Sequence, residues 1–431
     1  MAGDLRIALA GLGTVGAGVI RLLAENGDLI AQRAGRSIVI TAVSARDRTK
    51  YRGVDLSGYA WEDDMTALAA RDDVDVVVEL VGGSDGPALA LARKALADGK
   101  AFVTANKAMV AHHGMELAQL AESNAAPLRY EAAVAGGIPA IKGLGEGAAA
   151  NRVERIYGIL NGTCNYILSE MEGTGRDFGD VLSEAQARGY AEADPTFDIE
   201  GVDAAHKLAI LAALGFGTVL DFDSVETTGI SRIRAVDIAQ AGALGYVIRL
   251  IGLADRDGKD LFQRIAPYLV PKGHPLAGIG GPTNAVAVEG NFAGRLLFEG
   301  AGAGDGPTAS AVVADLVDIA RGNTPPPFSL PVSALTKAQP ADTGHRRNRA
   351  YLRFMVADRP GVLAEITAAM RDAGVSIESL IQQGRQEESD EPVLVTMVTH
   401  EGPEGAVARA LDLLANSESL AEEPLVMRLL G

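Results

Sequence analysis

The sequence has a single cysteine, few aromatic residues and no long apolar run. Cys164 is the one cysteine among 431 residues, so the chain can form neither an internal disulfide nor a zinc site made of several thiolates. No segment reaches the roughly 18 consecutive apolar residues that a membrane-spanning helix needs. The first residues, Met-Ala-Gly-Asp-Leu-Arg-Ile, do not join a basic segment to an apolar one, so no signal peptide is expected. These absences predict a cytoplasmic protein.

Positive charge is also scarce. The chain has 56 aspartate and glutamate residues against 39 lysine and arginine residues, a formal net charge of −17. Binding nucleic acid through its phosphates requires a basic face, and an anionic membrane surface makes the same demand. We therefore expect neither nucleic acid nor a membrane as a partner. Local basic clusters can still bind the phosphates of a small nucleotide.

The length of the chain predicts two or three domains, and the first is expected over residues 1–130. Short apolar strands alternate there with helical patterns, an order typical of a doubly wound parallel sheet of the Rossmann type within the α/β class. The expected strands cover 5–10, 38–43, 74–81 and 101–104, and one of the helices covers 88–98.

Residues 131–340 follow a different pattern and predict an α+β domain. Strands are expected at 153–160 and 225–235, and helices at 164–172, 179–214 and 308–321. The last part, 308–340, is expected to pack back onto the first domain, and 341–349 reads as a linker.

Residues 350–431 are expected to form a third domain. Their pattern of strand, helix, strand, strand, helix, strand is the ferredoxin-like βαββαβ order. The expected elements are 351–357, 360–373, 375–383, 393–399, 404–415 and 425–430.

A glycine motif follows the first expected strand and opens a helix. Gly11, Gly13 and Gly16 have the spacing of a dinucleotide-binding turn, with Thr14 and Val15 in the first helical turn. The three glycines permit a tight turn, approach of the main chain to a pyrophosphate, and close packing of helix on strand. The helix N-terminus favours the phosphates. The motif predicts a nicotinamide dinucleotide cofactor.

Basic residues follow the second strand. NAD-specific sites usually carry a carboxylate at the end of this strand, whereas an arginine suits the 2′-phosphate of NADP. Arg46, followed by Arg48 and Lys50, favours NADP as the cofactor. Asp47 is a carboxylate in the same segment, so NAD stays an alternative. A solvated run of charges is the alternative interpretation.

The segment 189–207 gathers five acidic residues, a histidine and a lysine. Asp203 and Lys207 are four residues apart and share one face of a helix. The apolar run 208–214 follows directly, which predicts a mostly buried helix rather than an exposed ion pair. A desolvated lysine can donate and accept protons near neutral pH. Lys207 is therefore a candidate catalytic residue, with a structural ion pair as the alternative.

At this point the chain resembles the homoserine dehydrogenases over about residues 5–330. The resemblance rests on the segment just described and on four further motifs: Thr104-Ala-Asn106-Lys107-Ala, Glu131-Ala-Ala-Val134-Ala-Gly136-Gly137-Ile138-Pro139, Asn161-Gly-Thr163-Cys164-Asn165-Tyr166-Ile167-Leu168, and Glu299-Gly-Ala-Gly302-Ala-Gly304 before Pro307-Thr308. The C-terminal unit resembles an ACT domain, with Asp358-Arg-Pro360-Gly361-Val-Leu at its first turn. ACT domains commonly bind amino acids.

The resemblance implies a reaction and a set of site residues. The reaction is the reversible NADP- or NAD-dependent reduction of L-aspartate 4-semialdehyde to L-homoserine, in threonine, methionine and isoleucine biosynthesis. The implied catalytic residues are Lys207, Lys107 and Asp198. The implied substrate ligands are Glu192, Asp203, Thr163 and Gly162. Lys107, Gly189, Gly302 and Gly304 would join the first glycine motif and Arg46 around the cofactor.

The resemblance also implies a sodium ion, an effector and an assembly. Glu131 and the main-chain carbonyls of Val134, Gly136 and Ile138 would match the family's sodium site, and oxygen ligands suit a hard cation. The second domain would carry catalysis and dimerisation, giving a homodimer or homotetramer. Threonine, the product of the pathway, would act through the ACT domain.

Two other functions stay open at this stage. The family usually has threonine where Cys164 stands. A nucleophilic thiolate there would instead suit a phosphorylating aldehyde dehydrogenase that forms a thioester. The second alternative is a non-catalytic regulator that binds amino acids, against which Lys107, Glu192 and Lys207 argue.

Overall fold

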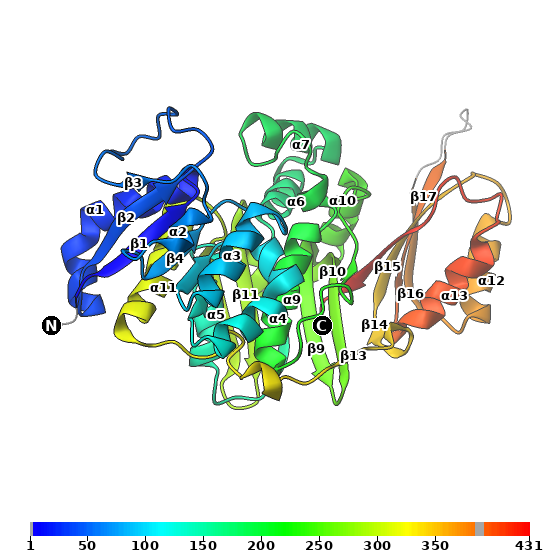
Figure 1. The fold of residues 1–431 in the computed structure, drawn as a ribbon. Coiled ribbons are helices and arrows are strands. Elements are labelled where there is room, and N and C mark those ends of the chain that lie inside the picture. The colour runs from blue at the N-terminus through cyan, green and yellow to red at the C-terminus, as the bar shows by residue number, and fades with distance from the viewer. Residues whose placement is uncertain (1–2, 384–391) are drawn as a thin grey trace.

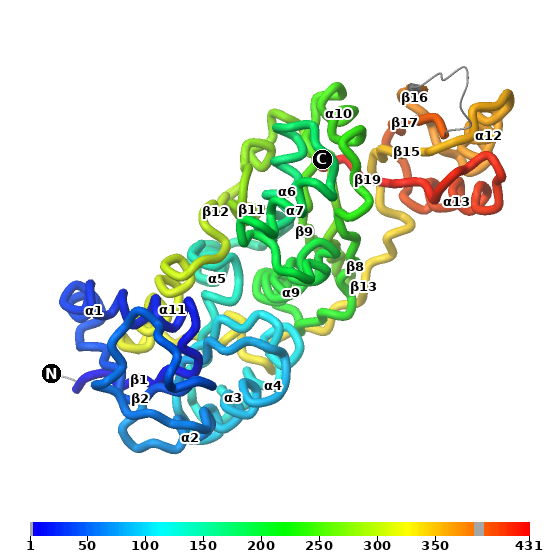
Figure 2. Tube along the Cα trace, turned by 90° about the horizontal axis from the view of Figure 1, so that it is seen from above, coloured from blue at the N-terminus to red at the C-terminus, as the bar shows by residue number. Residues whose placement is uncertain are grey.

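The computed structural model describes residues 3–383 and 392–431. These residues build three units that follow one another in a row, with the N-terminal unit at one end and the C-terminal unit at the other (Figures 1 and 2). Within the described ranges, no helix is long and apolar enough to cross a membrane.

Parallel strands form the sheet of the N-terminal unit. Their order, β3-β2-β1-β4-β5-β6, is that of a doubly wound dinucleotide-binding sheet. The strands are β1 (Leu5–Ala10), β2 (Ile38–Ser44), β3 (Ala60–Trp61), β4 (Val76–Glu79), β5 (Ala101–Thr104) and β6 (Leu128–Arg129). The helices are α1 (Thr14–Ala34), α2 (Ala67–Ala70), α3 (Pro87–Ala97) and α4 (Lys107–Ser123). The predicted Rossmann-type sheet is confirmed.

One helix from much later in the chain completes this unit. Helix α11 (Asp305–Arg321) packs against α1, and Leu316 lies in the same buried cluster as Leu5, Ile7 and Leu9 of β1. Arg21 pairs with Asp305 at 2.5 Å at the start of α11. The N-terminal unit is therefore built from two distant stretches of sequence, and the domain boundaries drawn from the sequence stay predictions.

The central unit is built on long antiparallel strands. Strand β9 (Tyr246–Asp257) and strand β10 (Asp260–Pro271) form a hairpin whose twelve pairs run through its whole length. Strand β7 (Val153–Ile159) pairs with β9, and β11 (Thr283–Gly290) and β12 (Gly294–Ala301) continue the sheet.

Several helices cover one face of this sheet. They are α6 (Gly162–Thr174), α9 (Val202–Phe216) and α10 (Ala235–Ala243), which contact its strands. Helix α7 (Phe178–Ala187) packs on α6, α8 (Thr196–Ile199) packs on α9, and the short α5 (Ala140–Lys142) packs on residues 131–133. The prediction of one continuous helix over 179–214 is wrong. Gly189 takes a positive φ of 76° and Pro195 follows, so the chain leaves helical geometry between α7 and α8.

The prediction of a strand over 225–235 is also wrong. Only β8 (Glu226–Thr227) pairs with β10. The chain then turns away from the sheet, because the Ile230 N–H donates to the Ile199 carbonyl at 2.9 Å. Asp237 caps α10 by accepting the Arg234 N–H at 2.9 Å.

The C-terminal unit has the expected βαββαβ order, and its sheet order β19-β15-β17-β16 is ferredoxin-like. Its elements are β15 (Ala350–Val356), α12 (Val362–Asp372), β16 (Ile377–Gln383), β17 (Val393–Thr399), α13 (Glu404–Leu414) and β19 (Leu425–Leu429). The remaining strands have two residues each: β13 (Gln339–Pro340), β14 (Arg347–Asn348) and β18 (Gly402–Pro403). Strand β13 pairs with β10 of the central unit, and β14 pairs with β18.

Strand β19 joins the C-terminal unit to the central unit. It pairs antiparallel with β15 and parallel with β10, so that one sheet of eleven strands runs through both units. The chain therefore ends beside the central unit (Figures 1 and 2), where Arg155 donates to the Gly431 carbonyl at 2.6 Å.

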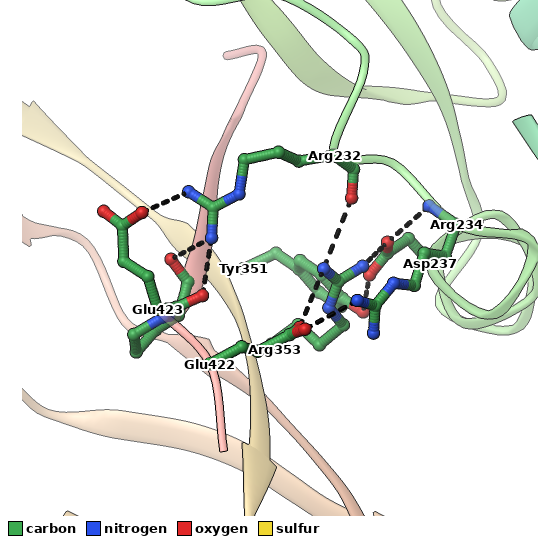
Figure 3. A network of polar contacts seen from close by, with 8 residues as sticks. Arg232, Arg234, Asp237, Tyr351, Arg353, Glu422 and Glu423 are labelled. Carbon is green, nitrogen blue, oxygen red and sulfur yellow. Dashed lines mark hydrogen bonds and ion pairs between the residues drawn. The ribbon is translucent and has the colours of Figure 1, made fainter. Parts of the chain in front are cut away.

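A buried polar network reinforces this junction (Figure 3). Arg353 of β15 and Asp237 of α10, whose side chains are 1% and 0% exposed, form an ion pair. The Tyr351 hydroxyl donates to Asp237 at 3.0 Å, and Arg353 also reaches the Arg232 carbonyl and Glu422, each at 3.3 Å. Because a buried charge is costly unless it is paired, this network fixes the two units against each other.

Candidate active site

The first glycine motif forms the turn between β1 and α1. A Cβ at Gly11 would lie 2.6 Å from the Leu80 carbonyl oxygen, and one at Gly16 would lie 2.2 Å from that of Gly11. A Cβ at Gly13 would meet no atom within 4 Å. Packing thus requires the first and third glycines, whereas the second leaves the main chain open at the helix N-terminus.

The first turn of α1 suits an anionic group. No side chain caps this helix, and its first turn carries no acidic residue. The main-chain N–H groups there, including those of Thr14 and Val15, lack partners within the helix and are suited to a pyrophosphate. The loop therefore fits a dinucleotide.

The basic segment after β2 lies beside this loop. Arg46 is exposed, and the Arg52 side chain donates to the Leu12 carbonyl at 3.1 Å. The Asp47 carboxylate accepts the N–H and the hydroxyl of Thr49, at 2.8 and 2.7 Å. The one carboxylate in the segment is thus engaged by its own loop, while the Arg46 guanidinium makes no hydrogen bond to the described residues.

A chain of hydrogen bonds places Lys107 at the carboxyl edge of the sheet. The buried Glu79 at the end of β4 accepts the Thr104 hydroxyl at 2.6 Å, and the Thr104 oxygen accepts the Asn106 N–H at 2.9 Å. Asn106 caps α4 and its amide donates to the Gly83 carbonyl at 2.6 Å. Lys107 is therefore the first residue of a helix whose start is fixed from two strands.

Asp203 brings two lysines together at the junction of the first two units. Lys207 of α9 donates to Asp203 Oδ2 at 2.7 Å and to the Leu160 carbonyl at 2.8 Å. Lys107 Nζ lies 3.1 Å from Asp203 Oδ1. Asp203 and Lys207 are buried, with 4% and 8% of their surface exposed.

These two lysines stabilise the ionised form of the Asp203 carboxyl group. Burial alone would raise the pKa of the Asp203 carboxyl, but the ammonium groups of Lys207 and Lys107 outweigh burial and hold the pKa well below its ordinary value. The carboxylate is therefore ionised at neutral pH. Each of its oxygens faces one lysine.

Asn161 and Asp198 complete the cluster. The Asn161 amide donates to Asp198 Oδ1 and to Asp203 Oδ2, both at 2.8 Å. Burial, and after it the charge of Asp203, raises the pKa of Asp198. Gly162 opens α6, and the Thr163 hydroxyl lies 2.8 Å from the Tyr190 carbonyl and 3.3 Å from Asp198 Oδ2.

Asn161 was not among the sequence-predicted site residues. The signal was present, because an asparagine directly before Gly-Thr is a strong helix N-cap. That pattern alone predicts the start of a helix and says nothing of the two carboxylates across the site.

Gly189 and Glu192 lie further out. Both belong to the loop between α7 and α8, which contacts the cluster through Thr163 and the Tyr190 carbonyl. Glu192 is exposed, and its carboxylate makes no hydrogen bond with any residue of the described ranges. The structure places these two residues at the rim of the site rather than beside Lys207.

The later glycines allow two loops to pack closely on each other and on strand β11. A Cβ at Gly302 would lie 1.6 Å from Asn284 Oδ1, and one at Gly136 would lie 2.5 Å from the Gly302 carbonyl oxygen. Gly304 precedes α11 as its N-cap. The loop that was predicted to close over the cofactor therefore packs directly on the loop of the predicted cation ligands.

The predicted cation ligands include a buried carboxylate. Glu131, 2% exposed, accepts the N–H groups of Ile141 and Lys142 at 3.0 and 2.9 Å. The Ile138 carbonyl accepts the Ala140 N–H at 2.7 Å. No cluster of three or more His, Cys, Asp or Glu side chains suited to a metal occurs in the described residues. A cation here would depend on main-chain oxygens such as those of Val134 and Gly136.

Cys164 is packed in the interior of the protein. Its thiol is fully buried and donates to the Asp198 carbonyl at 3.2 Å. Burial, and then the charge of Asp198, raises the pKa of the thiol well above its ordinary value. A nucleophile must be a thiolate at working pH, so the thioester-forming alternative is not favoured.

The C-terminal unit has a hollow of its own, with a volume of about 800 Å³. It lies between the first turn of α12 and strand β16. Its lining includes Asp358, Arg359, Pro360, Gly361 and Gln382.

Fold and site together define a nicotinamide-dependent oxidoreductase. The glycine turn at the switch between β1 and β4 fits a dinucleotide, and Lys207 stands where the two units meet with a charged partner on one side. That combination provides a hydride carrier and a group that can move a proton.

Comparison with known proteins gives the family. The profile described as homoserine dehydrogenase matches residues 139–317, that of the homoserine dehydrogenase NAD-binding domain matches 11–131, and that of the ACT domain matches 350–414. The homoserine dehydrogenase of Pseudomonas aeruginosa is 43% identical over 97% of this chain and 96% of its own, and that of Neisseria gonorrhoeae 44% over 98% of both. The chain belongs to the homoserine dehydrogenase family.

Solved structures agree with this assignment. A homoserine dehydrogenase from Thiobacillus denitrificans superposes with a TM-score of 0.93 at 41% identity, covering 100% of this chain and 99% of that one. A hyperthermophilic archaeal homoserine dehydrogenase, determined in complex with NADPH, gives 0.63 at 25% identity over 73% of this chain and 97% of that one. The predicted family, enzyme class and ACT domain are confirmed, and a non-catalytic regulator is not favoured.

Proposed function

We propose that this enzyme reduces L-aspartate 4-semialdehyde to L-homoserine reversibly, with NADP as its preferred cofactor and Lys207 as the proton-transferring group. The observation that carries the proposal is the buried Asp203 carboxylate held between Lys107 and Lys207. The step serves threonine, methionine and isoleucine biosynthesis. A single, buried cysteine favours a cytoplasmic location.

When bound, the nicotinamide supplies or accepts the hydride. Lys207 has three N–H donors, of which the Leu160 carbonyl and Asp203 take two. The third donates to the aldehyde oxygen of the substrate and gives it the proton that completes the alcohol. In the reverse direction the neutral amine takes the proton from the homoserine hydroxyl. Asp203 keeps the side chain of Lys207 oriented in both directions of the reaction.

The other residues bind and orient the substrate. Lys107 lies across Asp203 from Lys207 and faces the nicotinamide and the substrate. Glu192 binds the substrate ammonium after movement of its exposed loop, while Thr163, with Gly162 beside it, and Asp198 hold the polar end of the substrate.

The cofactor preference rests on the segment after β2. Asp47 is engaged by Thr49, so its carboxylate is less suited to hold the ribose hydroxyls, whereas the exposed Arg46 suits a 2′-phosphate. The archaeal relative solved in complex with NADPH is consistent with this preference. NAD remains a usable cofactor.

We also propose a sodium ion at Glu131, with the main-chain carbonyls of Val134, Gly136 and Ile138. The buried Glu131 carboxylate is served only by main-chain N–H groups, because the Lys142 ammonium bonds Asp318 at 2.5 Å instead. Unfolding midpoints in sodium chloride and in choline chloride of equal ionic strength test this, and identical midpoints would contradict it.

Threonine is the proposed effector of the C-terminal unit. Asp358 and Arg359 in the hollow offer charges of both signs, as the ammonium and carboxylate of an amino acid require.

We further propose a homodimer or homotetramer, supported by strands β12 and β16, which end the described eleven-stranded sheet as open edges. Light scattering measures the assembly.

Lys207→Ala is expected to lower kcat by about 10²- to 10⁴-fold, because the chemical step loses its proton donor. The dissociation constant for NADPH, measured by fluorescence titration, should change by less than about threefold, because the cofactor does not depend on this side chain. Lys94→Ala, an exposed lysine of α3, serves as the control. Near-normal turnover by Lys207→Ala would remove Lys207 from the mechanism.

Arg46→Ala is expected to raise the KM for NADPH about tenfold or more and to change that for NADH little, because only NADPH carries the 2′-phosphate. Gly13→Ala is the matched variant: its methyl group meets no protein atom but faces the pyrophosphate common to both cofactors. It should weaken both alike. Steady-state rates with each cofactor measure this, and an equal effect of Arg46→Ala on the two would contradict the NADP preference.

Asp358→Ala is expected to raise the threonine concentration needed for half of its effect on the rate about tenfold or more, because the effector ammonium loses its partner. Calorimetric titration with threonine measures the binding directly. Deleting the unit is a poorer test, because β19 pairs with β10 and Arg353 with Asp237. Absence of threonine binding to the unaltered enzyme would refute the proposal.

A further inference from the structure

We propose that Asn161 is a positioning residue for the reaction: its single amide group fixes both Asp198 and Asp203, and through Asp203 it sets the direction of the Lys207 ammonium. This inference rests on the proposed role of Lys207. Asn161 touches no reacting atom in the proposed mechanism. It acts through the carboxylates that it holds.

The hydrogen bonds of Asn161 use its whole side chain. Asn161 is buried, with 3% of its surface exposed. Its carbonyl oxygen accepts the Cys164 N–H at 2.8 Å, and its two amide hydrogens go to Asp198 and Asp203 at 2.8 Å each. Because the Cys164 N–H can only donate, the oxygen must face α6, and the NH₂ group must face the two carboxylates.

The amide joins groups that would otherwise separate. Asp198 and Asp203 are carboxylates close enough that the charge of Asp203 contributes to the raised pKa of Asp198. The amide donors between them offset this repulsion and hold both in place. Without the amide, Asp203 Oδ2 keeps only the Lys207 ammonium and the Asp198 carboxylate keeps only the Thr163 hydroxyl, so that both carboxylates can turn.

The position of one oxygen carries the effect to Lys207. Asp203 Oδ2 accepts both the Asn161 amide and the Lys207 ammonium, at 2.8 and 2.7 Å. The Leu160 carbonyl, which fixes a second N–H of Lys207, belongs to the residue directly before Asn161. With both acceptors fixed, the third N–H of Lys207 has one direction. A rotation of Asp203 would misdirect it, and small errors of geometry cost large factors in rate.

Capping alone does not explain an asparagine here. Serine and aspartate cap helices about as well as asparagine does. Neither can accept the Cys164 N–H and also donate to two carboxylates. Substitution by these residues therefore separates the start of α6 from the holding of Asp198 and Asp203.

The test compares Asn161→Ser and Asn161→Asp with the unaltered enzyme. For Asn161→Ser we expect kcat to fall about 30-fold or more, while the KM for NADPH stays within about twofold and the thermal midpoint changes by only a few degrees. For Asn161→Asp we expect kcat relative to the unaltered enzyme to rise as the pH falls from about 8.5 to about 6, because the introduced carboxyl group can donate one hydrogen bond when it is protonated, whereas its ionised form adds a third carboxylate to the cluster.

The control is Asn165→Ser. Asn165 is the next asparagine of α6, is fully buried and donates to the carbonyls of Ile279, Gly281 and Thr283. The Asn165→Ser variant should lose thermal stability, but the pH profile of its kcat should match that of the unaltered enzyme. The proposal is overturned if the Asn161 variants lose only stability, with the kcat and pH profile of the folded enzyme unchanged. If Asn161→Asp does not fold, Asn161→Ser alone tests the proposal. A fall in its kcat with an unchanged KM for NADPH supports the proposal, and an unchanged kcat overturns it. Unimpaired Lys207→Ala would instead refute the role of Lys207 itself.

Discussion

The ionised carboxylate of Asp203, held between Lys107 and Lys207, is the interaction on which the site depends. Lys107 comes from the sheet edge of the N-terminal unit and Lys207 from a helix of the central unit. One buried charge with two opposite partners is stable where a lone buried charge is not. The same bridge therefore joins the two units and orients the group that moves the proton, so a change in either unit reaches the chemistry through Asp203.

The surrounding structure limits how far this bridge can move. Helix α11 closes the N-terminal unit from a distant part of the chain, and the loop before it packs on the loop of Glu131. On the other side, Arg353 of the ACT domain bonds the Arg232 carbonyl (Figure 3). Two residues earlier, the Ile230 N–H donates to Ile199, the neighbour of Asp198. Two hydrogen bonds, joined by short stretches of main chain, thus connect the ACT domain with the edge of the active site.

Local patterns in the sequence predicted most of the fold and part of the site. The glycine turn, the parallel sheet and the βαββαβ unit each follow from spacing within a short stretch. The strand at 225–235 failed because its residues pack on α8, and the long helix failed at Gly189 and Pro195. The parallel pairing of β19 with β10 depends on residues far apart in sequence, and so do the two hydrogen bonds from the Asn161 amide to Asp198 and Asp203. Local periodicity does not record such contacts.

The most direct test of the central claim is Asp203→Asn, assayed with NADPH and with cofactor carrying deuterium at the transferred position. The amide keeps the shape of the side chain and removes the charge that orients both lysines. The account predicts a fall in kcat of about 100-fold or more and a primary isotope effect larger than that of the unaltered enzyme, because proton and hydride transfer become rate-limiting. A kcat within about threefold of the unaltered enzyme, with the same isotope effect, would contradict it.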